Sequence, residues 1–178
     1  KLLMRPAAYY VERAIEARFS TLAKRVDPVQ KVVELENGER IAYTKVLVAT
    51  GVRNRKLPVP GADLPGIYDL RTIADADRIR TACRPGCQAI VVGMGFIGSE
   101  VAATLRQSGV AVTVIEPLPI PLAHILGDDV GRVFADFHRE NGVRMHFGEL
   151  VTRFEGVDRV QRVITNAGRQ LDCDFVVV

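Results

Sequence analysis

The pattern of hydrophobic and polar positions differs between the two halves of this chain. In the segment "RPAAYYVERAIEARF", apolar side chains recur at helical spacing, which predicts a helix over residues 6 to 16. Short alternating runs follow, broken by an Asp-Pro pair at positions 27–28 and an Asn-Gly pair, a favoured hairpin turn, at 37–38. We expect a small antiparallel β meander leading into a buried strand over residues 45 to 50.

The second half predicts alternating strands and helices. Residues 51 to 66 hold three prolines and three glycines, which indicates a connecting loop. A helix is predicted over residues 73 to 82, closed by "RPG". The order then becomes strand, helix, strand, helix, strand, at residues 88 to 93, 96 to 108, 111 to 116, 128 to 141 and 144 to 147. Such alternation predicts a parallel sheet built from βαβ units.

The end of the chain returns to this sheet. "LVTRFEG" and "RVQRVITNAGRQL" predict two or three antiparallel strands, and "DFVVV" a buried parallel strand. The fold class is therefore α/β, and the pattern divides the chain near residues 75 to 85. Because the chain lacks an initiator Met and stops inside a predicted strand, we expect it to be a piece of a longer protein.

Composition restricts the function classes only weakly. Hydrophobic residues make up 48% and charged residues 25%, an ordinary globular balance, and the net charge is +3 without a run of five like charges. The longest apolar stretches fall far short of the ~20 residues that span a bilayer. We expect a soluble, cytoplasmic protein with no nucleic-acid or membrane partner.

The three cysteines, Cys83, Cys87 and Cys173, form neither a disulfide framework nor a zinc pattern, so no metal site is predicted. The stretch "CRPGC" resembles the loose redox pairs of some flavoenzymes. It lies, however, in the predicted turn between a helix and a strand, and we interpret these cysteines as small, non-catalytic residues of a tight connection.

The strongest motif is "VVGMGFIGSE", in which Gly93-x-Gly95-x-x-Gly98 joins a predicted strand to a predicted helix. In a dinucleotide fingerprint the first glycine permits the tight turn and the second leaves room for a diphosphate. The third, Gly98, lets the helix lie close to the strand. The free N–H groups and positive dipole end of that helix would then face the diphosphate.

Two acidic residues accompany the glycines. Glu116 ends the next predicted strand, 18 residues beyond Gly98, where a carboxylate accepts hydrogen bonds from the adenosine ribose. Pro117 and Leu118 follow instead of an arginine, which favours NADH over NADPH. The alternative is a tight glycine turn without a ligand. Glu100, in the first helical turn, is favourable there through the helix dipole alone, so its spacing does not establish a functional role.

Together these motifs resemble a known family. The runs "VLVATGVRNRKLPVPGADLPGIYDLRTIADADRIR", "VVGMGFIGSEVAATLRQSGVAVTVIE" and "GVRMHFG" are similar to FAD-dependent, NADH-using ferredoxin and rubredoxin reductases of the pyridine nucleotide–disulfide oxidoreductase superfamily. The resemblance covers essentially the whole chain. It implies two Rossmann-like domains and a C-terminal interface domain, with residues 1–75 as an incomplete part of the FAD-binding domain and residues 76–178 as the inserted NAD-binding domain.

The resemblance also implies site roles. The "ATG" motif, Ala49, Thr50 and Gly51, would end a strand near the flavin nucleotide, Arg53 would contact FAD, and Ala23 would meet the adenine through its backbone.

Further roles concern the nicotinamide end. Phe96 and Ile97 would line or gate the nicotinamide pocket, and Glu100 would pair with an active-site lysine that lies outside this chain. The chain departs from the family at Ile120 and His124, where arginines are frequent, which puts cationic contacts to NADH in doubt. His124 is either a partial substitute or an ordinary surface residue.

The implied activity is hydride transfer from NADH to FAD, followed by single-electron transfer to a ferredoxin or rubredoxin type partner, in which the cofactors carry the chemistry. The chain alone is expected to be inactive and to bind NADH weakly without stoichiometric FAD. The alternatives are a nitrite-reductase-like protein, a disulfide or peroxide reductase on the same scaffold, and a non-catalytic NAD-binding interaction module.

Overall fold

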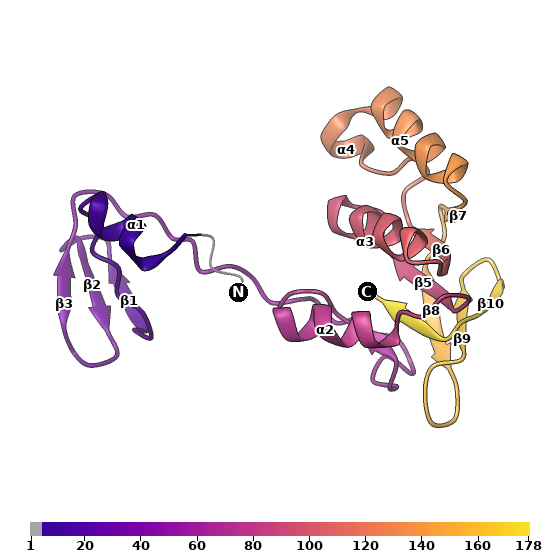
Figure 1. Ribbon diagram of the computed structural model, residues 1–178, viewed down its shortest axis with the longest axis horizontal. Coiled ribbons are helices and arrows are strands. Elements are labelled where there is room, and N and C mark those ends of the chain that lie inside the picture. The colour runs from indigo at the N-terminus through magenta and orange to yellow at the C-terminus, as the bar shows by residue number, and fades with distance from the viewer. Residues whose placement is uncertain (1–4) are drawn as a thin grey trace. The chain divides into compact units, whose positions relative to one another are not determined.

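A computed structural model describes residues 5 to 178, and the chain divides into two compact units at Gly51 and Val52 (Figure 1). The loop of residues 52 to 66 therefore belongs to the same unit as the parallel sheet. The assignment of residues 1–75 to a flavin domain and of 76–178 to an NAD domain stays a prediction.

The first unit begins with helix α1, Ala7–Glu12, which is shorter than the predicted helix over residues 6 to 16. Its end is a Schellman motif, in which Ala14 adopts the left-handed conformation with φ of 52°. The backbone N–H of Ile15 donates to the carbonyl of Tyr10, and that of Ala14 to the carbonyl of Val11. The helix therefore stops although the apolar periodicity continues.

The predicted antiparallel meander is confirmed. Strands β1, β2 and β3 form a sheet in that order, over Ala23–Asp27, Val32–Leu35 and Arg40–Ala42. The first turn is held by the carboxylate of Asp27, which accepts the backbone N–H groups of Val29 and Gln30. The second turn contains Gly38 with φ of 84°, a conformation that glycine adopts without a steric cost.

The predicted buried strand over residues 45 to 50 is wrong for this chain. The segment is irregular, and Leu47 is 88% exposed. A strand needs a neighbour for its backbone hydrogen bonds, and no strand among residues 5 to 178 pairs with this segment. Its apolar side chains consequently stay exposed.

The second unit is built on a five-stranded sheet in the order β4-β11-β5-β6-β7, and all its strand pairs are parallel. The strands span Ile67–Tyr68, Phe175–Val177, Gln88–Val92, Ala111–Glu116 and Arg144–Phe147 in that order. The predicted parallel sheet is confirmed, and the structure adds the short β4 at its edge.

Four helices belong to this unit. They are α2 over Ile73–Ala82, α3 over Phe96–Gln107, α4 over Ala123–Leu126 and α5 over Asp128–Glu140. The three longer helices agree with the predicted ranges to within one residue at each end, whereas the four-residue α4 was not predicted. The antiparallel sheet β10-β9-β8 is also confirmed, over Gln170–Asp172, Arg162–Thr165 and Val151–Glu155.

The central sheet is buried on both faces. Along β5, Ala89 and Val91 pack in a core cluster with residues of α2 and α3, whereas Ile90 packs in a second cluster with residues of β8 and β9. This two-sided burial explains why β5 is a continuous apolar run rather than an alternating one. The unit consequently has three layers, with helices on one face and the antiparallel sheet on the other.

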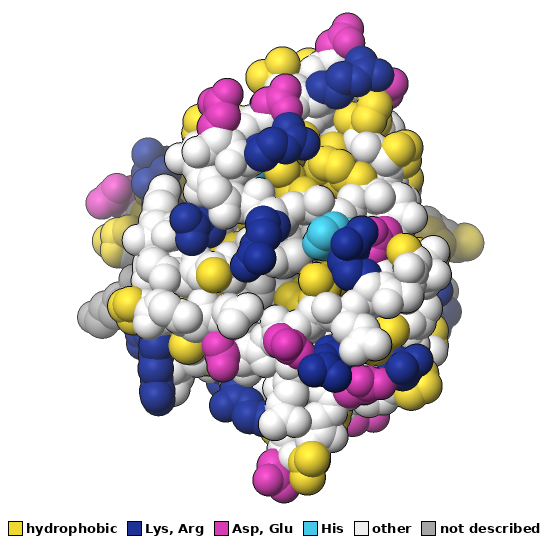
Figure 2. All heavy atoms as spheres, turned by 90° about the vertical axis from the view of Figure 1, so that its right-hand side faces the viewer, with side chains coloured by type: hydrophobic (Ala, Val, Ile, Leu, Met, Phe, Trp, Pro, Cys, Tyr) yellow, Lys and Arg dark blue, Asp and Glu magenta, His cyan; other side chains and the backbone are white. Residues whose placement is uncertain are grey.

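The surface carries no concentrated charge on the face that Figure 2 shows. Lys and Arg side chains lie singly among acidic ones there, as the mixed charge of the sequence predicts. In the part of the chain that the structure describes, no helix combines the length and apolar character needed to cross a bilayer.

Candidate dinucleotide-binding site

The glycine fingerprint forms a tight turn between β5 and α3. Gly93 has φ of 97°, and its N–H donates to the carbonyl of Ile115 on β6 at 2.8 Å, so the turn begins where both strands end. A Cβ added at Gly98 would lie 2.2 Å from the carbonyl oxygen of Gly93. The same Cβ would lie 3.6 Å from a methyl group of Val91 on β5, so Gly98 brings the helix close to both the turn and the strand.

Gly93 and Gly95 border open space instead. A Cβ added at either position would meet no atom within 4 Å. Gly95 is the N-cap of α3, and no side chain caps the first N–H groups of this helix. Those N–H groups and the positive end of the helix dipole are available to an anion, as in other dinucleotide folds.

Glu116 lies at the carboxyl end of β6 and is only 6% exposed. Its Oε2 accepts the backbone N–H of Met94 at 2.5 Å, and its Oε1 accepts the backbone N–H of Leu118 at 2.9 Å. A carboxylate offers about four acceptor positions, so two bonds leave capacity for further donors. The structure thus ties this side chain to the middle of the fingerprint turn, a contact that spacing alone did not reveal.

A cavity of about 470 Å³ lies beside the fingerprint. It is bordered by the carboxyl ends of β5 and β11, which are neighbours in the sheet. After β5 the chain continues to β6 on one side of β5, and it later returns to β11 on the other side. This is the topological switch point, where open α/β sheets bind their ligands. Its lining consists of Asn54, Arg55, Leu70, Val91, Val92, Gly93, Gly95, Phe96, Ile97, Gly98, Val101, Val177 and Val178.

Phe96 and Ile97 project from the first turn of α3 and are 51% and 62% exposed. Both line this cavity. Glu100 lies in the second turn of α3, not in the first turn as predicted, and is exposed. It lines a different hollow of about 520 Å³, between α2 and α3. Ile97 borders both spaces, so Glu100 lies next to the fingerprint cavity without contributing to it.

His124 lies in α4 and is exposed. It makes no side-chain hydrogen bond or ion pair that would fix its orientation within the described residues. Its predicted contact to NADH stays a prediction. Ile120, the other position that departs from the family pattern, is close to Gly131, where an added Cβ would lie 2.7 Å from an Ile120 methyl group.

The match to known proteins decides the family. Residues 8–178 match the model of the pyridine nucleotide-disulphide oxidoreductases. The chain belongs to this family.

Its relatives within the pyridine nucleotide-disulphide oxidoreductase family include ferredoxin reductases. Rhodocoxin reductase of Rhodococcus erythropolis is 38% identical over 178 residues, which are 99% of this chain and 42% of that protein. The ferredoxin–NAD(+) reductase component of the biphenyl dioxygenase system of Paraburkholderia xenovorans is 34% identical over 172 residues, 97% of this chain and 42% of that protein. The chain therefore spans less than half the length of these curated relatives.

A solved member of the family has the same fold. The ferredoxin reductase for the CYP199A2 system of Rhodopseudomonas palustris superposes with a TM-score of 0.83 and 36% sequence identity. The match covers 99% of this chain and 44% of that one. The predicted resemblance and the α/β, Rossmann-like fold class are confirmed.

The residues predicted to contact a flavin do not form one described site. Ala23 begins β1 and lines a hollow of about 290 Å³ together with other residues of the first unit. Residues 49 to 51 do not line this hollow. Ala49, Thr50, Gly51 and Arg53 are exposed on an irregular segment. Arg53 belongs to the second unit and the other four residues to the first, and their flavin contacts stay a prediction for a family member of full length.

The cysteines lie away from the fingerprint cavity. Burial, followed by the carboxylates of Asp174 and Asp172, raises the pKa of the Cys173 thiol to about 12. This thiol is consequently protonated at neutral pH and a poor nucleophile. Cys83 and Cys87 are half-buried and pack against the core under the helices, as expected for residues of a tight connection.

Sequence reasoning missed two polar residues of the cavity, Asn54 and Arg55. They lie in the proline-rich loop, nearly forty positions before the fingerprint, and only folding brings the two segments together. The run "RNRK" was the one available signal, since basic residues recur there within a loop.

Proposed function

We propose that this chain supplies the NADH-binding part of a flavin-dependent reductase that passes electrons to a ferredoxin or rubredoxin type protein. The observation that carries the proposal is the geometry around the fingerprint. Gly98 is required for packing against the turn and Gly93 for its φ of 97°, whereas Gly95 leaves open space beside uncapped helix N–H groups. Neither packing nor backbone conformation requires glycine at position 95.

The diphosphate of NADH would bind at the start of α3. The side-chain-free surface at Gly95 lets phosphate oxygens approach the backbone, where N–H groups and the helix dipole stabilise their negative charge. The adenosine ribose would lie at Glu116, whose remaining acceptor positions suit the two ribose hydroxyls. A 2′-phosphate at the same place would meet an anion, which favours NADH over NADPH.

The nicotinamide end would extend over Phe96 and Ile97, whose exposed side chains offer an apolar surface at the switch point. When bound, the flavin supplies the hydride acceptor and the one-electron chemistry towards the partner. In this proposal Phe96 and Ile97 exclude water from the nicotinamide, and Glu100 holds a lysine of the flavin domain by charge pairing.

The nature of the acceptor is supported by the relatives. Two of them are a rhodocoxin reductase and a ferredoxin–NAD(+) reductase, and the chain aligns with each over nearly its whole length. FAD and the electron-transfer partner would be bound with the help of segments beyond the 42% of those proteins that this chain matches.

Calorimetric titration with NADH, NADPH and FAD tests the proposal directly. NADH should bind more tightly than NADPH, and FAD should not bind stoichiometrically. Tight binding of FAD, or a preference for NADPH, would contradict the assignment.

Glu116→Gln sharpens the test, because it keeps the side-chain size and removes the charge. Its amide has one acceptor oxygen for the two backbone N–H groups that the carboxylate accepts, so thermal unfolding must show that the variant folds. We expect NADH binding to weaken by about 1.5 to 3 kcal/mol, the usual value for a hydrogen bond to a charged group. NADPH binding should weaken less or improve, because the repulsion of its 2′-phosphate is removed. Glu140→Gln, the same charge change at the exposed end of α5, is the control. An equal loss for both nucleotides would instead indicate a purely structural role of Glu116.

A further inference from the structure

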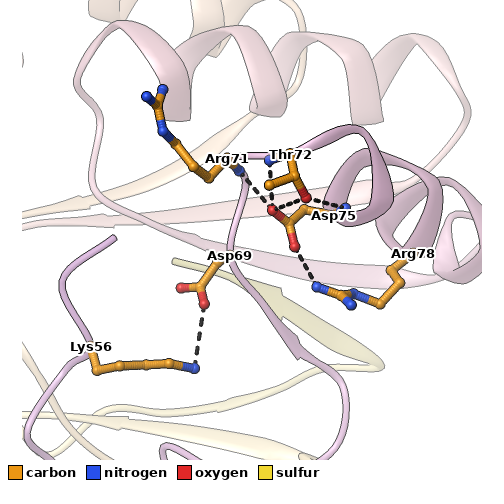
Figure 3. A network of polar contacts seen from close by, with 6 residues as sticks. All are labelled: Lys56, Asp69, Arg71, Thr72, Asp75 and Arg78. Atoms are coloured by element: carbon orange, nitrogen blue, oxygen red, sulfur yellow. Dashed lines mark hydrogen bonds and ion pairs between the residues drawn. The ribbon is translucent and has the colours of Figure 1, made fainter. Parts of the chain in front are cut away.

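The loop over residues 52 to 56 is fastened at both ends to the connection between β4 and α2. At one end, the Nε of Arg71 donates to the carbonyl oxygen of Val52 at 3.0 Å. At the other end, the Nζ of Lys56 lies 3.3 Å from Oδ2 of Asp69 (Figure 3). Of the three residues between these anchors, Arg53, Asn54 and Arg55, the last two line the fingerprint cavity.

The first anchor is itself held in place by the start of α2. The buried carboxylate of Asp75 accepts the backbone N–H of Arg71 at 3.1 Å and that of Thr72 at 2.6 Å. It also accepts the hydroxyl of Thr72 at 2.7 Å and pairs with Arg78 (Figure 3). This capping box fixes the backbone from which the Arg71 side chain reaches the loop.

The cavity has a positive electrostatic character. Lys56 is neutralised by Asp69, whereas no carboxylate among residues 5 to 178 forms an ion pair with the guanidinium of Arg55. The uncapped N-terminus of α3, which carries a positive partial charge, borders the same space. Glu116 lies at the neighbouring strand end and is not among the residues that line this cavity. The arrangement therefore suits an anion between α3 and the loop.

We propose that Arg55 is a phosphate-binding residue of the dinucleotide site, which contacts the diphosphate of NADH from the loop that precedes β4. A guanidinium presents paired N–H donors that match phosphate oxygens, and the anchored loop lowers the entropy cost of holding it there. This contact would replace the cationic residues that are missing at Ile120 and His124. The proposal rests on the proposed function, because it takes NADH as the ligand.

The test compares Arg55→Gln with Arg84→Gln, which removes the same charge from an exposed residue that does not line the cavity. NADH and adenosine are titrated into each variant and into the unaltered chain, and thermal unfolding confirms that the variants fold. We expect Arg55→Gln to weaken NADH binding roughly tenfold, as for the loss of one charge-assisted hydrogen bond. Arg84→Gln should change it less than about twofold, since Arg84 is exposed and lies outside the cavity lining.

Two further readouts separate a phosphate contact from a general effect. Adenosine, which has no phosphate, should bind equally well to Arg55→Gln and to the unaltered chain, and Arg55→Lys should restore part of the NADH affinity. Equal effects of Arg55→Gln and Arg84→Gln on NADH, or an equal loss of adenosine binding, would overturn the proposal. Absence of NADH binding by the unaltered chain would instead overturn the proposed function together with it.

Discussion

Gly98→Ala tests the claim that the third fingerprint glycine serves packing. The new Cβ would lie 2.2 Å from the carbonyl oxygen and 3.1 Å from the carbonyl carbon of Gly93. Because ordinary contacts lie near 3.5 Å, α3 would have to move by about 1 Å, and the obstacle is backbone that cannot rotate away. Overpacking of this kind costs about 1 to 3 kcal/mol, and the better helix propensity of alanine returns at most about 1 kcal/mol.

We therefore expect a net loss of about 2 kcal/mol in the free energy of unfolding. For a domain of this size each kcal/mol corresponds to roughly 4 °C, so the Tm should fall by about 8 °C. Thermal unfolding followed by circular dichroism, with urea denaturation as a second measure, gives both quantities.

Gly95→Ala is the matched control, three positions earlier in the same motif. Gly95 has φ of −73° and ψ of −173°, which alanine adopts readily, and its new Cβ would meet no atom within 4 Å. Its Tm should stay within about 2 °C of the unaltered chain, whereas NADH binding should weaken at least tenfold, because the methyl group occupies the space assigned to the diphosphate. A Gly98→Ala variant with unchanged stability would refute the packing argument, and a Gly95→Ala variant with unchanged NADH affinity would refute the ligand assignment.

Two further predictions concern titration. Hydrogen bonds from the Thr72 hydroxyl and backbone, followed by the Arg71 N–H, hold the pKa of Asp75 below its ordinary value, so the charged form stabilises the fold above about pH 4. Asp75→Asn should lower the Tm at pH 7. The Tm difference between the variant and the unaltered chain should shrink as the pH falls through the lowered pKa of Asp75. A Tm difference that stays constant in acid would contradict this reasoning. In the folded chain at pH 8, a thiol reagent should modify at most Cys83 and Cys87. Cys173 should react only after unfolding, because its side chain is buried and its pKa is raised. Rapid reaction of all three thiols would contradict the burial of Cys173.

Local chemistry explains where the sequence-based expectations hold. The strand Arg144–Phe147 and the helix Ile73–Ala82 were predicted to the residue. Thr72 and Asp75 form a capping box around the start of that helix, and "RPG" prevents its continuation. Where the capping residues, the helix-ending residues and the apolar periodicity agree in this way, a short segment determines its own structure.

The sequence-based predictions fail where segments far apart in the sequence determine the local structure. The apolar run over residues 45 to 50 has the composition of a buried strand, but a strand exists only with a neighbour to accept its hydrogen bonds. The end of α1 depends on Ala14 in a left-handed conformation that glycine usually adopts, so the sequence did not signal it. The short β4 forms because β11, more than a hundred residues later, lies beside it.

The features of the candidate site likewise fall into those that the sequence predicts and those that only the folded structure shows. The sequence by itself determined the spacing of Gly93, Gly95 and Gly98 and the place of Glu116 at a strand end, because a βαβ unit is a local structure with a fixed geometry. Only the tertiary structure decided that Met94 orients the Glu116 carboxylate and that Arg55 lines the same cavity. The physical reason is that such contacts join residues far apart in the sequence, so no local pattern specifies them, and they arise only when the sheet and its connecting loop pack into one unit.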